Sequence, residues 1–207
     1  MSLLTNWGYS LVDDSALTNL MTLEEFDDFT ADKYSGDMRT ERDIAAASAA
    51  VRNYCGWHVY PSAACELATT YFDGRVTRVG SSMMIQLPAT YVSKVTNITI
   101  DGTEHDLYAI GANGLLKVFG VFGYLPEYAP IFVEYEAGLP DELAASIKEL
   151  VAHRVTHALA SSDGIQSETA GGVSITYSAG WLNSAGATAL ADDNRQTLEP
   201  YRLQGVF

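Results

Sequence analysis

Cysteine and long apolar runs are scarce in this sequence. Two cysteines among 207 residues, Cys55 and Cys65, are too few for a disulfide scaffold. His58 lies near them, but a lone Cys-x-x-His without a second ligand pair favours structural cysteines over a metal site. No apolar run reaches the roughly 18 residues typical of a membrane-spanning helix. The N-terminus has no basic region ahead of its apolar residues, so we expect no signal peptide, no membrane contact and a protein made in a cytoplasm.

Basic residues are also few. The chain has 12 Lys and Arg against 26 Asp and Glu, which gives a formal net charge of −14. Such a surface repels phosphate backbones and argues against a protein that grips DNA or RNA. A channel through which DNA slides is nevertheless better lined with repulsive charge than with attractive charge.

Motifs of catalysis are missing as well. The sequence contains no Walker loop, no G-x-S-x-G elbow and no G-x-G-x-x-G. Its acidic pairs are adjacent in sequence, and neighbours on a helix point apart, so they do not form paired catalytic carboxylates. We therefore predict no enzyme activity, no cofactor and no catalytic or metal site.

One stripe keeps a metal alternative open. Glu149, His153 and His157 recur at intervals of four on a predicted helix, the spacing that zinc helices use. The hydrolytic version needs a glutamate directly after the first histidine, where this sequence has Arg154. A metal-dependent hydrolase thus remains one hypothesis, and a solvated or subunit-facing stripe is the other.

The segment from Thr40 to Trp57 has the most complete helix signals. Thr40 is predicted to cap the first turn, and Gly56 follows the last periodic residue as a helix end requires. The predicted core face holds the residues spaced at i, i+4, i+7 and i+11: Ile44, Ser48, Val51 and Cys55. Alanines make the other side thin, so we predict that Ala46, Ala49 and Asn53 face a neighbouring element or subunit.

Strand and turn signals fill the middle of the chain. Before them, Thr22 and Glu25 have capping-box spacing for a short acidic helix. Asp73-Gly74 predicts a hairpin between strands within residues 65–79, and Asp101-Gly102 predicts a second turn. Residues 118–130 form an aromatic loop that is either folded back on the sheet or an exposed contact surface.

These signals predict an α+β fold. Helices are expected near residues 22–30, 40–56, 140–160 and 187–198, with residues 1–21 as an extended arm or an irregular lead-in. A β-rich antiparallel sheet or barrel is inserted between the second and third helices. The predicted domains are a helical core from 1–62 and 137–199 with a strand near 173–178, the β-rich insertion at 63–136, and a C-terminal tail at 200–207.

The order of several segments resembles a known family. TLEEF, IAAASAAVRNYCGWHV, LPATYVSKVTNITIDG, VEYEAGLPDELAASIKELVAHRV and SETAGGVSITYS occur in that order between Thr22 and Arg202. Together they resemble the gp6-like head–tail connector (adaptor) proteins of long-tailed bacteriophages. The large β-rich middle departs from the smaller, helical members.

The resemblance implies a ring, typically a dodecamer, in the virion neck, assembled in the host cytoplasm. Its partners would be other copies of the chain, the portal protein and a downstream neck or tail-completion protein, with DNA passing through the lumen without specific binding. Closed rings use two different surfaces of each subunit. The interface candidates are Ala46, Ala49, Asn53, Glu149, His153 and His157.

The C-terminal segment has too little apolar content to fold alone. It is expected to gain order by docking into the portal, and the alternative is a frayed terminus. The docking candidates are Tyr201, Arg202, Leu203, Gln204, Gly205, Val206 and Phe207. Alternatives for the whole chain are another neck or head-completion protein, the metal-dependent hydrolase, and a small-ligand binding module on the β-rich part.

Overall fold

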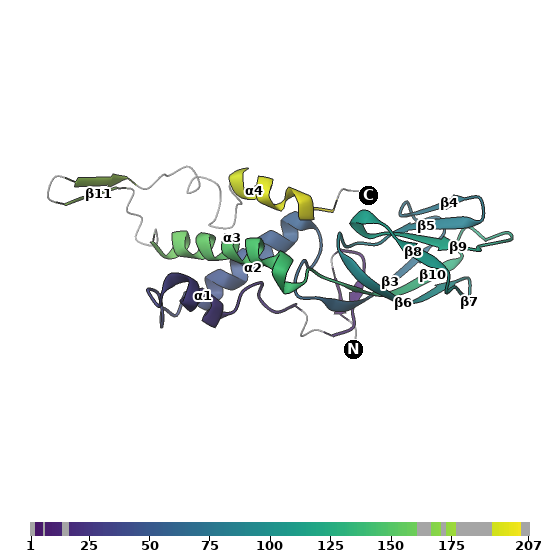
Figure 1. Ribbon diagram of the computed structural model, residues 1–207, viewed down its shortest axis with the longest axis horizontal. Helices are drawn as coiled ribbons and strands as arrows, with labels where there is room; N and C mark the ends of the chain where they lie inside the picture. Colours follow the sequence, from purple (N-terminus) through teal and green to yellow (C-terminus); the bar gives the residue numbers. More distant parts are fainter. Residues whose placement is uncertain are drawn as a thin grey trace. The chain divides into compact units, whose positions relative to one another are not determined.

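The chain folds into helices at both ends of a β-rich middle (Figure 1). The computed structural model describes residues 3–5, 7–13, 17–160, 167–170, 173–176 and 192–203. The helices are α1 (Leu23–Thr30), α2 (Thr40–Cys55), α3 (Asp141–Ala160) and α4 (Asp192–Leu198), followed by a 3-10 turn at Glu199–Tyr201. The predicted α+β class is confirmed.

Contacts divide the chain into two compact units. The sheet unit comprises residues 1–18, 55–143 and 201–207, and the helix unit comprises residues 19–54 and 144–200. The boundaries fall between residues 18 and 19, at the end of α2, within the first turn of α3, and between residues 200 and 201.

The larger sheet of the sheet unit has six strands in the order β1-β2-β3-β10-β6-β7, paired antiparallel. They are β1 (Leu3–Leu4), β2 (Ser10–Leu11), β3 (Ala63–Thr70), β10 (Pro130–Ala137), β6 (Val92–Ile100) and β7 (Thr103–Glu104). The β6–β7 turn at Asp101-Gly102 has positive φ at both residues, so this predicted hairpin is confirmed.

The smaller sheet has four antiparallel strands in the order β4-β5-β9-β8. They are β4 (Val76–Val79), β5 (Ser82–Gln86), β9 (Leu115–Phe119) and β8 (Tyr108–Ile110). The Tyr108 hydroxyl donates to the Val95 carbonyl at 2.9 Å and joins this sheet to β6 of the larger one. The expected β-rich part is therefore two sheets and not a closed barrel.

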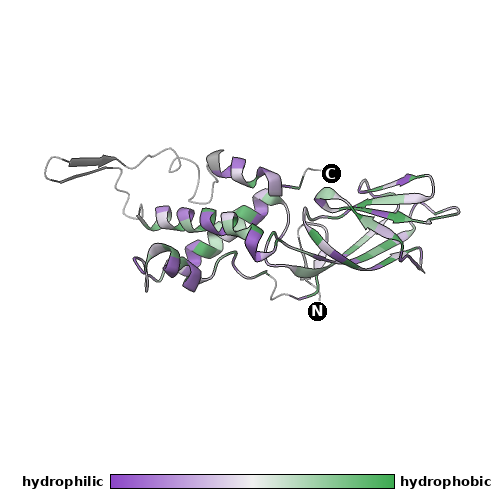
Figure 2. Ribbon diagram, in the orientation of Figure 1, coloured by the Kyte–Doolittle hydropathy of each residue, from purple (hydrophilic) through white to green (hydrophobic). Residues whose placement is uncertain are grey.

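Alternation along the strands builds the core of this unit. On β10 the burial pattern alternates without a break, with Ile131, Val133 and Tyr135 buried and Phe132 and Glu134 exposed. Figure 2 shows the same alternation of apolar and polar residues on the strands. Buried partners come from both sheets, among them Leu67, Met83, Ile85, Ile98, Leu116 and Val118.

The predicted hairpin at Asp73-Gly74 is wrong. β3 pairs with β10 along all eight residues, whereas β4 pairs with β5 in the other sheet. The Asp73 carboxylate accepts the Thr69 hydroxyl at 2.7 Å and the Arg75 N–H at 3.0 Å. These bonds fix a corner that carries the chain from one sheet to the other, and the hairpin turn lies instead at Gly80-Ser81.

Of the two alternatives for residues 1–21, the described part favours an extended arm, because it contains strands β1 and β2. β2 adds to β3, and both Tyr9 and Leu11 are buried. The Tyr9 hydroxyl lies 2.7 Å from Nδ1 of buried His58 and accepts the His58 N–H at 3.0 Å. The Ala137 carbonyl can only accept, so the His58 Nε2 at 2.8 Å carries the hydrogen. One imidazole thus links β2, the chain after α2 and the end of β10.

In the helix unit, α2 and α3 supply the core. The predicted core face of α2 is confirmed, because Ile44, Ser48, Val51 and Cys55 are all buried. α3 contributes the buried residues Ala144, Ile147, Leu150, Val151, Val155 and Leu159. The Ser48 hydroxyl accepts the Leu20 N–H at 3.0 Å, which attaches the entry segment of the unit to the middle of α2.

The two threonines predicted to cap helices behave differently. Thr22 forms the complete capping box with Glu25 at the start of α1. Thr40 is buried and its hydroxyl has no hydrogen-bond partner. The predicted Thr40 cap is therefore wrong, because Thr40 is already the first helical residue of α2 and its side chain points into the core.

A β-hairpin follows α3 in the chain. β12 (Val173–Thr176) confirms the expected strand near 173–178 over its described residues. It pairs antiparallel with β11 (Ser167–Ala170). The first residues of the helix predicted at 187–198 lie outside the described residues, and α4 occupies the remainder.

Gly138 is required where β10 ends. Its φ is +133°, and a Cβ built there would lie 2.4 Å from the Pro61 carbonyl oxygen. We expect Gly138→Ala to lower the free energy of unfolding by about 2 kcal/mol or more, since backbone atoms must shift. Urea denaturation measures this. Gly74→Ala is the control, because Gly74 has open space around it; equal losses in the two variants would contradict the prediction.

The two threonines provide a matched pair of tests. Thr22→Val removes a used capping hydroxyl and should lower stability by about 1 kcal/mol. Thr40→Val replaces an unpartnered buried hydroxyl by a methyl group of similar volume, so stability should stay constant or rise by up to about 1 kcal/mol. Thermal unfolding of both variants checks the prediction, and a larger loss for Thr40→Val would refute it.

Candidate functional site

The exposed side of α2 is the first candidate surface. Ala46, Ala49 and Asn53 are all exposed, one helical turn after another, opposite the buried Ile44 and Val51. Because alanine projects so little, another backbone can approach this face closely. The two-faced character predicted for α2 is thus present in the single chain, and what covers the thin face stays a prediction.

The stripe on α3 is the second candidate. Glu149, His153 and His157 are exposed on one side of α3. The His153 Nε2 lies 3.6 Å from a Glu149 carboxylate oxygen, and the Phe29 ring meets the imidazole edge-on at 5.2 Å between centroids. Within the described part of the chain, no three His, Cys, Asp or Glu residues are placed to hold a metal ion.

These two surfaces have different neighbours within the helix unit. Lys148, next to Glu149 on α3, forms an ion pair with Glu25 of α1 at 2.8 Å. Tyr54, next to Asn53 on α2, donates from its hydroxyl to the Glu199 carboxylate after α4 at 2.8 Å. The His153–Phe29 contact places the α3 stripe beside α1, whereas the Tyr54–Glu199 bond places the end of α4 beside the last turn of α2.

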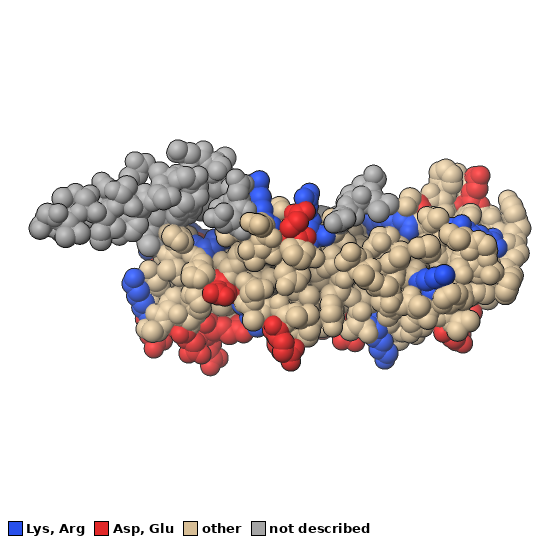
Figure 3. Space-filling view, turned by 45° about the horizontal axis from the view of Figure 1, so that its top comes forward, with Lys and Arg blue, Asp and Glu red and all other residues tan. Residues whose placement is uncertain are grey.

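Negative charge is concentrated around α1 and the start of α2. Acidic side chains gather at the lower left of Figure 3, the end at which α1 lies in Figure 1. Burial acts to raise the pKa of Glu25, but the Lys148 ammonium and the Thr22 amide outweigh it and the pKa is lowered. Residues 24–43 contain these acidic residues: Glu24, Glu25, Asp27, Asp28, Asp32, Asp37, Glu41 and Asp43.

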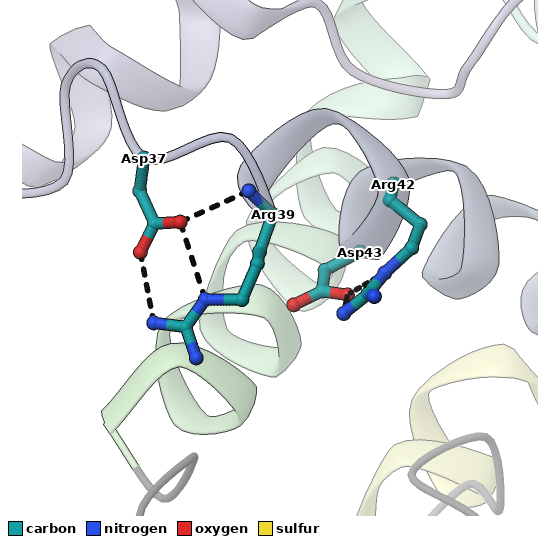
Figure 4. A network of polar contacts seen from close by, with 4 residues as sticks. All are labelled: Asp37, Arg39, Arg42 and Asp43. Atoms are coloured by element: carbon teal, nitrogen blue, oxygen red, sulfur yellow. Dashed lines mark hydrogen bonds and ion pairs between the residues drawn. The ribbon is translucent and has the colours of Figure 1, made fainter.

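Two arginines offset part of this charge. The Asp37 carboxylate accepts the Arg39 backbone N–H at 2.9 Å and its guanidinium at 3.0 and 3.2 Å (Figure 4). These hydrogen bonds hold the pKa of Asp37 below its usual value. One helical turn on, Arg42 binds Asp43 at 3.0 Å. Both pairs are local, so they shape the start of α2 and do not form a catalytic constellation.

The described part of the C-terminal candidate is attached to the end of α2. The Leu203 N–H donates to the Cys55 carbonyl at 2.8 Å, and the Trp57 indole N–H donates to the Tyr201 carbonyl at 2.7 Å. Cys55 therefore has its helix-terminal carbonyl satisfied by the C-terminal segment. Gln204, Gly205, Val206 and Phe207 lie outside the described residues.

The aromatic loop between β9 and β10 is both anchored and exposed. The Arg78 guanidinium donates to the Gly80, Val121 and Gly123 carbonyls at 3.1, 2.9 and 2.8 Å. The exposed side chains are Phe122 at 78%, Tyr124 at 88% and Tyr128 at 76%. Of the two alternatives for residues 118–130, the structure favours the exposed surface.

The cysteines are not reactive groups. Cys55 and Cys65 are both buried, and neither takes part in a disulfide. Burial raises the pKa of Cys65 to about 12, so its thiol stays protonated at neutral pH and is a poor ligand or nucleophile. His58, which lies near the two cysteines in the sequence, is hydrogen-bonded to Tyr9 and Ala137 and is not available as a third metal ligand.

Comparison with known families decides the class. The family model described as head completion protein matches residues 19–202. The chain belongs to the head completion protein family. No curated protein matches the sequence. None of the helices in the described ranges has the length and apolar content that a bilayer crossing requires.

Membership makes this head completion protein a structural component of a phage head and neck, not an enzyme. The resemblance to neck proteins and the predicted lack of enzyme activity are confirmed at that level. The surfaces described above are therefore candidates for contacts with other head and neck components. Sequence reasoning did not identify the exposed side of β10, which carries Phe132 and Glu134, because the strand register that creates it could not be read from the sequence.

The attachment of the C-terminal segment can be tested directly. Trp57→Phe removes the N–H that binds the Tyr201 carbonyl, a bond contributing about 1 kcal/mol, together with part of a fully buried indole ring. We expect faster hydrogen exchange at the Leu203 amide. Trp7→Phe makes the same chemical change elsewhere in the sheet unit and should leave that exchange unaltered. Unchanged exchange in Trp57→Phe would show that the indole does not hold the segment.

Proposed function

We propose that this head completion protein is a head–tail connector of the gp6-like kind, a ring subunit docked between the portal and the next neck or tail-completion protein. The observation that carries the proposal is the pair of distinct exposed stripes on the helix unit, one on α2 and one on α3. Its role is structural: it extends the portal channel and catalyses no reaction.

Ring closure needs two different surfaces on each subunit. In a head-to-tail ring, one surface of a subunit binds the other surface of the next. The thin stripe of Ala46, Ala49 and Asn53 suits close helix approach, and the stripe of Glu149, His153 and His157 supplies polar partners for it. Twelve copies are expected from the resemblance to connector families.

The C-terminal segment is proposed to attach the ring to the portal. Tyr201, Arg202 and Leu203 begin this segment, and the bonds of Tyr201 and Leu203 to Trp57 and Cys55 give it a fixed origin. Residues 204–207 would then extend from that origin and bind in the portal.

The charge of the chain supports passage of DNA without binding. At −14 per subunit, a ring of these chains repels the phosphate backbone wherever acidic residues line the lumen. Assembly would take place in the host cytoplasm, and the mature location is the virion neck.

Ring formation can be tested through the thin face. Ala49→Trp places a bulky ring on the α2 stripe and should abolish ring assembly, with or without portal, while leaving the fold intact because Ala49 is exposed. Mass photometry and negative-stain images measure the assembly, and circular dichroism measures the fold. Ala109→Trp, an exposed alanine of the smaller sheet, is the matched control. Rings of normal size from Ala49→Trp would remove α2 from the interface.

Portal attachment is tested by deletion of residues 204–207, which leaves the bonds of Tyr201 and Leu203 in place. We expect rings that form normally and bind purified portal protein at least about tenfold more weakly than the wild type. Portal binding that is unchanged by the deletion would contradict the docking role of the segment.

A further inference from the structure

The outer face of the larger sheet combines exposed aromatic side chains with unneutralised acidic ones. On β10, Phe132, Glu134 and Glu136 alternate with buried residues and are exposed, Phe132 at 51%. The register places Phe132 between Ala68 of β3 and Thr99 of β6. The middle of the larger sheet therefore carries a half-exposed phenyl ring on its outer face.

Beyond Phe132 the same two strands lead to more aromatic surface. The Tyr71 N–H donates to the Ala129 carbonyl at 3.1 Å, one step past the last paired residues of β3 and β10. Phe72 and Tyr128 lie next to this bond and are 73% and 76% exposed. Exposed rings of this size, held on a rigid scaffold, are typical centres of protein interfaces.

In the other direction the face becomes acidic. Glu66 of β3 and Glu134 of β10 are directly opposite each other in the register. The residues directly beside this pair are Ser10 and Asn97, both uncharged, and Lys94 of β6 is opposite Glu136, two residues further along β10. Neither glutamate takes part in an ion pair with another described residue.

A like-charge pair at this position is unfavourable for the isolated chain. Like charges directly opposite on neighbouring strands destabilise a sheet, and Thr or Lys in place of either glutamate would remove the repulsion. Stability therefore does not explain the pair. A partner that brings positive charge to Glu66 and Glu134 would explain it, because both carboxylates would then be attracted to the partner's positive groups.

We propose that this outer face, defined by Phe132, Phe72, Tyr128, Glu66 and Glu134, binds another head or neck protein whose surface carries apolar side chains next to Lys or Arg. Charge complementarity selects this occupant over a second copy of the chain. Two copies meeting through this face would set one Glu66–Glu134 pair against the other. The proposal rests on the proposed function only in that the partner belongs to the head or neck.

The test uses the full-length protein and purified DNA-filled heads and tails from a phage mutant that lacks it. Glu134→Lys should weaken binding to one of these particles at least about tenfold. The same variant should raise the urea midpoint of unfolding, since the introduced ammonium group would face the Glu66 carboxylate.

Phe132→Thr should also weaken binding, without removing the salt dependence that the wild type shows. Asp106→Lys, at an exposed position between β7 and β8 and outside the larger sheet, is the control for added positive charge and should bind as the wild type does.

Each outcome decides a different question. Wild-type protein that binds neither heads nor tails would overturn both this inference and the proposed function. Binding by the wild type that Glu134→Lys and Phe132→Thr retain in full would overturn this inference alone. Variants that bind particles normally but lose self-association in mass photometry would assign the face to contacts between copies, and so would overturn the chosen occupant.

Discussion

Strand β10 is the constraint on which the sheet unit depends. It pairs with β3 along eight residues on one side and with β6 on the other. Because side chains alternate along a strand, this double pairing determines at once what is buried and what is exposed. Ile131, Val133 and Tyr135 enter the core, so Phe132 and Glu134 must face outward. A slip of one residue would bury Glu134 and expose Val133, which hydrophobic burial strongly disfavours.

The end of β10 organises the connection to α2 in the same way. Gly138 passes so close to Pro61 that no side chain fits between them. Ala137 accepts the hydrogen bond from His58, and the Leu139 N–H donates to the Val59 carbonyl at 2.8 Å. Segments far apart in sequence are therefore held together by backbone approach and one buried imidazole. These contacts fix the position at which β3 begins.

Much of this architecture could be predicted from local sequence signals. The Thr22–Glu25 capping box, the Asp101-Gly102 turn and the apolar face of α2 each depend on residues within a few turns of one another. The Asp73-Gly74 prediction failed because the same dipeptide suits any tight turn, and only tertiary pairing decides whether the flanking strands share a sheet. Thr40 failed for a related reason: its sequence position suits a cap, but packing takes its side chain inside.

The proposed assembly surfaces also differ in how far the sequence alone can predict them. Ala46, Ala49 and Asn53 could be predicted to be exposed because helical periodicity assigns the faces of α2 without knowledge of any other element. The opposition of Glu66 and Glu134 could not be predicted, because the two residues are 68 positions apart and meet only through the register of β3 with β10.

The two units accordingly present surfaces of different chemistry. The helix unit offers a thin alanine face and a polar stripe, which suit close and repeated contact between identical chains. The sheet unit offers aromatic rings beside uncompensated acid, which suit a partner of opposite charge. A protein that closes a ring and also joins that ring to a different component needs both kinds of surface. Placing them on separate units lets each be shaped by its own core.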